Sequence, residues 1–113
     1  MKNYVQKGET LTLVAPYAVS SGGGALVGSI FGVAAGDLAS GAEGELKVEG
    51  VFDLTRETGG GTAWSPGDLV YWDNTNKRAT KTSTGNKLIG VAVKAAADGD
   101  ATGRVRLNGA FIS

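Results

Sequence analysis

Glycine interrupts this chain so often that a long helix has almost no place to form. The sequence holds 19 glycines in 113 residues, where average usage is about 7%. No glycine-free window of about 12 residues, the shortest length at which isolated helices become stable, repeats apolar side chains with helical spacing. Glycine at this frequency is typical of tight turns and bulges. We therefore expect a fold built from short strands.

Short runs of β type recur between the glycines, bounded by Gly, Asn, Asp and Ser. In residues 44–54 apolar and charged side chains alternate, and the alternation changes phase at Gly50. A change of phase at a glycine indicates a bulge or a barrel corner. The other expected strands cover residues 10–14, 25–27, 29–34, 69–72, 78–83, 88–94 and 103–107, with a mobile loop at 56–63 and a hairpin turn at 73–77.

Two parts of the sequence resemble each other. Residues 30–34 (IFGVA) are similar to residues 88–92 (LIGVA), and each is followed by a loop rich in Ala, Asp and Gly. Residues 44–52 and 103–111 then follow, and both contain a second glycine six residues after the first. We interpret this as two pseudo-repeated hairpins. The predicted fold class is all-β, a small antiparallel β-barrel or sandwich of short strands with Gly-rich loops, formed as a single domain over residues 1–113.

The residue types that most catalysis requires are scarce. Cys and His are both absent from the sequence, which removes thiolate metal sites, disulfides and the commonest general base. No Gly-x-x-x-x-Gly-Lys-Ser/Thr motif occurs, so a P-loop ATPase is excluded. The pair Asp98 and Asp100 resembles half of a calcium loop, but the later ligand positions are missing. We predict no enzyme activity, no cofactor and no metal site.

The charges are balanced. Lys and Arg number 11, Asp and Glu also number 11, and the formal net charge is zero. Nucleic-acid binders usually carry a positive excess that displaces counterions, whereas a net charge near zero favours association between proteins. The first residues lack the apolar core of a signal peptide, and no apolar run is long enough to cross a membrane. No membrane partner is expected.

Protein association is the remaining function that this composition favours. Aromatic side chains with a polar end are enriched in subunit interfaces. Tyr4 and Tyr17 flank the first expected strand, and Trp64 lies beside a run of glycines, so these three are the predicted interface residues, with Trp64 expected to be half-exposed. Tyr71 and Trp72 are adjacent in a strand and must point to opposite faces, and we expect Trp72 to lie in the core.

The whole chain resembles a family of small phage- and prophage-encoded proteins, some of which are similar to capsid cement or decoration proteins. The resemblance is carried by residues 4–11, 27–34, 44–54, 64–73, 88–92 and 105–109. Some members of that family bear the label RecA/RadA-family recombinase, which implies an ATPase. The missing P-loop excludes that activity for this sequence.

The resemblance implies a structural virion protein. Its expected role is that of a capsid cement or decoration subunit, which binds the major capsid protein on the capsid exterior, stabilises the phage head and self-associates as a homo-oligomer, with a trimer favoured over a dimer. We expect the protein in the virion, and in the host cytoplasm during assembly. One alternative is a nucleic-acid-binding module acting in phage recombination or packaging. A small enzyme or ligand-binding barrel, or a tail or fibre component, are further alternatives.

Overall fold

A computed structural model describes residues 3, 8–110 and 112 of the chain. Their regular structure consists of strands, without a helix, so the all-β prediction is confirmed. The strands are β1 Thr10–Val14, β2 Gly24–Val27, β3 Ile30–Ala34, β4 Glu43–Lys47, β5 Glu49–Thr55, β6 Leu69–Asp73, β7 Arg78–Thr80, β8 Lys87–Ala92 and β9 Thr102–Asn108.

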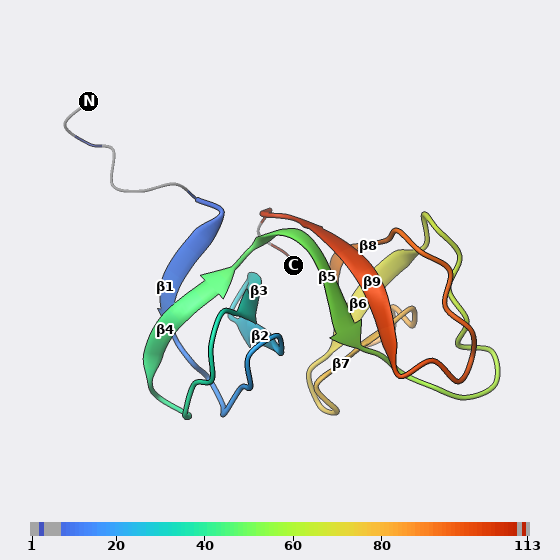
Figure 1. The fold of residues 1–113 in the computed structure, drawn as a ribbon, viewed down its shortest axis with the longest axis horizontal. Helices are drawn as coiled ribbons and strands as arrows, with labels where there is room; N and C mark the ends of the chain where they lie inside the picture. Colours follow the sequence, from blue (N-terminus) through green and yellow to red (C-terminus); the bar gives the residue numbers. More distant parts are fainter. Residues whose placement is uncertain (1–2, 4–7, 111, 113) are drawn as a thin grey trace.

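The strands form two antiparallel sheets that follow one another along the chain. The first has the order β1-β4-β3-β2 and the second the order β5-β9-β8-β6-β7. Figure 1 shows β4 leading into β5 as one green band that joins the two halves. Val48 separates these two strands, and Gly50 just beyond it has a φ of 125°, a conformation that favours glycine. The predicted change of phase at Gly50 therefore lies where the chain leaves one sheet for the other.

The two sheets repeat one pairing pattern, in which β5, β9, β8 and β6 correspond to β1, β4, β3 and β2. The register agrees as well: the pairs Val33–Lys47 and Ala34–Leu46 of the first sheet correspond to Val91–Arg106 and Ala92–Val105 of the second. Outside the strands, the bridge between Val19 and Leu38 corresponds to that between Trp64 and Ala96. The predicted pseudo-repeat is confirmed and extends beyond the hairpins. Residues 10–47 are called the first repeat below, and residues 49–108 the second repeat.

Strand β7 is the addition that distinguishes the second repeat. It pairs with β6 through a turn at residues 73–77, in which Lys77 takes a φ of 55°. The sheet curls so that its two outer strands meet, because Arg56, directly after β5, forms a parallel bridge with Ala79 in β7. The Glu57 carboxylate strengthens this contact by accepting a hydrogen bond from the Thr80 hydroxyl at 2.9 Å.

The larger of two hydrophobic cores extends across both sheets. Phe31 and Val33 alternate along β3 with Gly32 and Ala34. Their side chains therefore lie on the face of the first sheet opposite to that of Ala34. That face packs onto the interior of the second repeat, and Val33 is only 3% exposed. The larger core contains Phe31, Val33, Leu54, Trp64, Val70, Trp72, Ala79, Ile89, Ala92, Ala96, Val105 and Leu107, and the smaller one Val19, Ala25, Ala34 and Leu46.

Candidate functional site

A row of three aliphatic side chains and one arginine crosses the outer face of the second sheet. Residues paired across antiparallel strands lie on the same face of a sheet. Leu69 pairs with Val91, Val91 with Arg106, and Arg106 with Val51, so these four side chains form a row from β6 to β5. Leu69 and Val51 are each 53% exposed. This set is called the outer row below.

The surface beside the outer row is hollowed into a groove. The groove has a volume of about 310 Å³ and is mainly apolar. Its lining includes Leu69, Leu88 and Val91 from the sheet, Arg106 from β9, and Ile112 from the C-terminal segment. The backbone of Ile112 is held in place, because its N–H donates to the carbonyl of Ser29 at 2.8 Å. Exposed aliphatic side chains around a preformed groove are typical of surfaces that bind another protein.

The β2 and β3 side of the corresponding face of the first repeat is covered within the chain. There the equivalent row contains Gly24, Val33, Lys47 and Thr10. Gly24 leaves room for aromatic rings, since a Cβ at this position would lie 2.7 Å from atoms of both Phe31 and Trp72. The second repeat thus buries Gly24 and Val33 of this row, whereas Lys47 is exposed. The outer row has no such cover within the residues that the structure describes.

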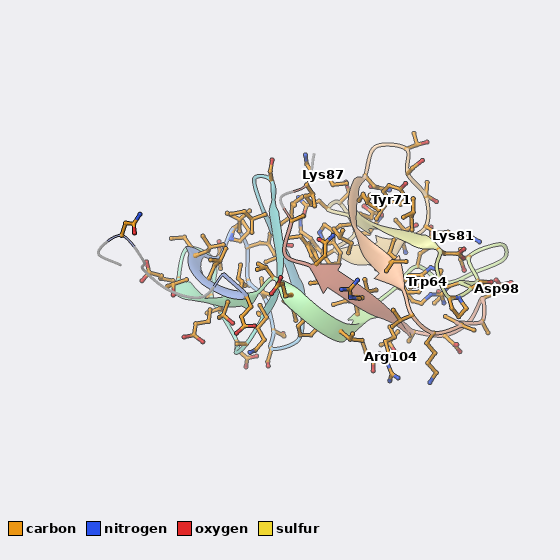
Figure 2. The ribbon with its side chains drawn as sticks, turned by 90° about the horizontal axis from the view of Figure 1, so that it is seen from above. Trp64, Tyr71, Lys81, Lys87, Asp98 and Arg104 are labelled. Atoms are coloured by element: carbon orange, nitrogen blue, oxygen red, sulfur yellow. The ribbon has the colours of Figure 1, made fainter. Side chains whose placement is uncertain are left out.

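The cations of the second repeat do not gather in one groove. Figure 2 shows Lys87 and Arg104 at opposite sides of this half of the molecule. Arg104 donates to the Asp53 carboxylate at 3.0 Å. This hydrogen bond lowers the pKa of Asp53 and raises that of Arg104. Arg106, in contrast, has no ion-pair partner among the described residues.

The structure gives different results for the three predicted interface residues. Tyr4 lies outside the described residues. Tyr17 is half-buried between the repeats, where its hydroxyl donates to the Gly24 carbonyl at 2.9 Å and its ring lies 4.1 Å from the Lys77 ammonium. Burial raises the pKa of this hydroxyl. Its use as an anchor for a neighbouring subunit stays a prediction.

The expected exposure of Trp64 is wrong. Its side chain is 3% exposed and belongs to the larger core. Figure 2 places it inside the second half of the molecule. The glycine run before it does not expose it, because the backbone of Trp64 pairs with Ala96 and draws the ring beneath β9. A Cβ at Gly103 in β9 would lie 2.2 Å from this ring, so the glycine provides the space that the indole occupies. Trp72 is also 3% exposed, which confirms its core position.

The side chain of Arg56, whose burial the sequence analysis did not predict, anchors the loop that begins at residue 56. Arg56 is 3% exposed, and its guanidinium donates to the carbonyls of Ala97 at 2.8 Å, Asp100 at 2.7 Å and Thr62. It also lies 5.1 Å from the centre of the Trp64 ring. The internal repeat could have indicated that this position is buried, because Arg56 corresponds to buried Ala15 in the first repeat. The expected loop at residues 56–63 is thus anchored at both ends.

The acidic residues of the loops stabilise backbone turns. Asp98 accepts from the N–H of Ala63 at 2.9 Å, and Asp100 accepts from the N–H of Ala97 at 2.8 Å. Across residues 8–110, no three carboxylates come together as a metal-binding group. The described residues also include no helix that could span a membrane.

The comparisons identify a family. A family model described as phage cement protein matches residues 5–107, which is most of the chain and includes both repeats except Asn108. No curated protein and no solved structure gives a significant match. The matched range contains all but the last residue of β9, the strand that carries Arg106 of the outer row. The described structure is all-β, the family match supports a structural role at the phage capsid, and the chain belongs to the phage cement protein family.

Proposed function

We propose that this protein is a cement subunit that binds the major capsid protein on the exterior of a phage head and associates with further copies of itself. The observation that carries the proposal is the match to the phage cement protein family over residues 5–107. In this proposal the protein is made in the host cytoplasm, assembles onto the head, and acts as a homo-oligomer, of which a trimer is the favoured form.

The construction of the fold supports a mechanical role. The chain enters the second sheet directly from the first, with only Val48 between β4 and β5. The larger core joins both sheets, so force applied to one repeat is transmitted through packed side chains to the other. A subunit of this kind resists separation of the capsid proteins beneath it.

The surface chemistry supports association with proteins. The outer row and its groove present aliphatic side chains with one free guanidinium, and burial of such a surface requires little desolvation of charge. Many copies act on one head, so a modest affinity at each contact is sufficient through multivalency.

The test is binding to heads that lack the protein. Heads assembled from the major capsid protein of the same phage are mixed with purified protein and sedimented. The expected result is saturable co-sedimentation, together with a higher temperature or denaturant concentration for head disruption. A protein shell of unrelated origin is the control.

Two other results would contradict the proposal. Absence of co-sedimentation at saturating protein would exclude the cement role. Binding to DNA that weakens steeply as salt rises, with no binding to heads, would instead support the nucleic-acid-binding alternative.

A further inference from the structure

The internal repeat indicates what kind of surface covers the outer row. Inside the chain, two positions of the equivalent row of the first repeat, Gly24 and Val33, are buried against a neighbouring repeat of related structure, with Trp72 filling the space above Gly24. Within the described residues no further repeat covers the outer row. A second copy of the chain would bring one to it.

Most exposed aliphatic side chains of the described structure lie on this face. The large hydrophobic residues that are most exposed are Val14, Val51, Leu69, Leu88 and Val93. Val51 and Leu69 belong to the outer row, and Leu88 lines the groove. Val93 follows β8, and its N–H donates to the backbone carbonyl of Arg104. Val14 is the exception and lies on β1 of the first repeat.

A symmetric contact between two outer rows is disfavoured by charge. Arg106 occupies the middle of the row, between Val91 and Val51. Two rows facing each other would bring two unpaired guanidinium groups together at the centre of the contact, and like charges placed opposite each other are destabilising. The contact is therefore expected between two different surfaces of the same chain.

The first repeat carries the complementary surface. The charged residues within 10–47 are Asp37, Glu43, Glu45 and Lys47, so this repeat has a net negative charge. Glu43 and Glu45 are exposed on one face of β4, and neither forms an ion pair within the described structure. Val14 pairs with Glu43 across β1 and β4 and is 53% exposed. This face also carries Lys47, so it combines an exposed aliphatic side chain with two unpaired carboxylates and one cation, and its net charge is negative.

We propose that copies of this protein associate head to tail. The outer row and groove of one copy bind the acidic face of β1 and β4 of the next copy, with Arg106 facing Glu45. Contacts between two different surfaces form rings when the rotation closes. The inference rests on the proposed function, for which it names the self-association surface.

The test is a charge reversal measured by analytical ultracentrifugation or light scattering over a range of protein concentrations. Arg106→Glu and Glu45→Arg are each expected to raise the dissociation constant for self-association by about tenfold or more, because each places like charges opposite one another. The double variant, Arg106→Glu with Glu45→Arg, restores an opposite pair at every contact and is expected to return close to the wild-type value.

The matched control is Lys77→Glu, which reverses an exposed cation in the turn between β6 and β7, outside the outer row and the lining of its groove. It is expected to leave self-association unchanged. An equal loss in this control would overturn the proposal, since net charge alone would then govern association. A double variant as weak as the single variants, with wild-type thermal stability, would also overturn it.

Head binding separates this inference from the proposed function. If the single variants associate like the wild type and still sediment with heads, the head-to-tail contact is wrong and the cement role stands. If the wild type neither associates nor binds heads, the cement role fails as well.

Discussion

The ring of Phe31 in the first sheet lies 4.9 Å from the ring of Trp72 in the second, with an angle of 52° between their planes. This pair joins two repeats that have the same strand order, and it lies in the core that both share. Tilted aromatic pairs at this distance stabilise a fold beyond the area that they bury. We propose that the whole chain unfolds as one domain for this reason.

Phe31→Ala tests this coupling between the sheets. We expect a loss of about 3–5 kcal/mol in the free energy of unfolding, because the substitution leaves a cavity between the repeats. Urea unfolding followed by far-ultraviolet circular dichroism and by tryptophan fluorescence measures it. Val14→Ala, at an exposed position, is the control and should change stability by less than about 0.5 kcal/mol. Two separate transitions in the wild-type protein would show that the repeats are independent domains.

Arg56→Met tests the buried guanidinium. Methionine retains much of the aliphatic length but leaves the carbonyls of Ala97, Asp100 and Thr62 without their donor. We expect a loss of about 3 kcal/mol in the free energy of unfolding. Arg104→Met removes an exposed ion pair with Asp53 and should cost much less stability than Arg56→Met, because exposed ion pairs contribute little. Equal effects of the two substitutions in chemical denaturation would refute the assigned role of Arg56.

Gly90→Ala tests the close approach of β8 to β9. A Cβ on Gly90 would lie 2.3 Å from the carbonyl oxygen of Arg106, and backbone cannot move aside as a flexible side chain can. We expect a loss of about 2 kcal/mol or more, as for other overpacked sites. Gly36→Ala is the control, because nothing lies within 4 Å of the added methyl group and the φ of Gly36 is not in the left-handed region. In thermal unfolding, the melting temperature of Gly90→Ala should lie well below those of Gly36→Ala and the wild type.

Asp73→Asn tests the hairpin turn between β6 and β7. The Asp73 carboxylate accepts from the side-chain amide of Asn76 at 2.8 Å and from the backbone N–H groups of Asn76 and Thr75. Hydrogen bonding by the Asn76 side chain is the main reason that the pKa of Asp73 is lowered. At neutral pH we expect the substitution to cost about 1 kcal/mol.

The effect of Asp73→Asn should depend on pH. A lowered pKa means that the ionised carboxylate stabilises the folded protein above its unfolded pKa of about 4, and that this contribution disappears as the pH falls through the folded pKa. The stability difference between wild type and variant should therefore shrink in acid. Denaturant titrations at a series of pH values measure it, and a difference that stays constant down to strongly acidic pH would contradict the assignment.

Much of the architecture followed from local features of the sequence. Glycines and short alternating runs predicted the strands, because a strand alternates its faces every second residue and a glycine-rich chain cannot sustain long helices. The similarity of residues 30–34 to residues 88–92 predicted the repeat, and the register of both hairpins confirmed it. The change of phase at Gly50 marked the passage between sheets. Strands, turns and the change of phase depend on neighbours along the chain, and the repeat is visible by comparing two segments of the sequence.

The burial of individual residues was decided by the tertiary structure. Trp64 and Arg56 occupy surface-like sequence next to glycines and charges, yet both are buried. Val33 and Val91 are equivalent residues in equivalent strands, but Val33 is covered by the second repeat and Val91 lies in the exposed outer row. The sequence by itself determined strands, turns and repetition, since these arise from backbone preferences and alternation. Which face of each repeat is covered depends on how two sheets, distant along the chain, pack against each other, and that is a property of the tertiary structure alone.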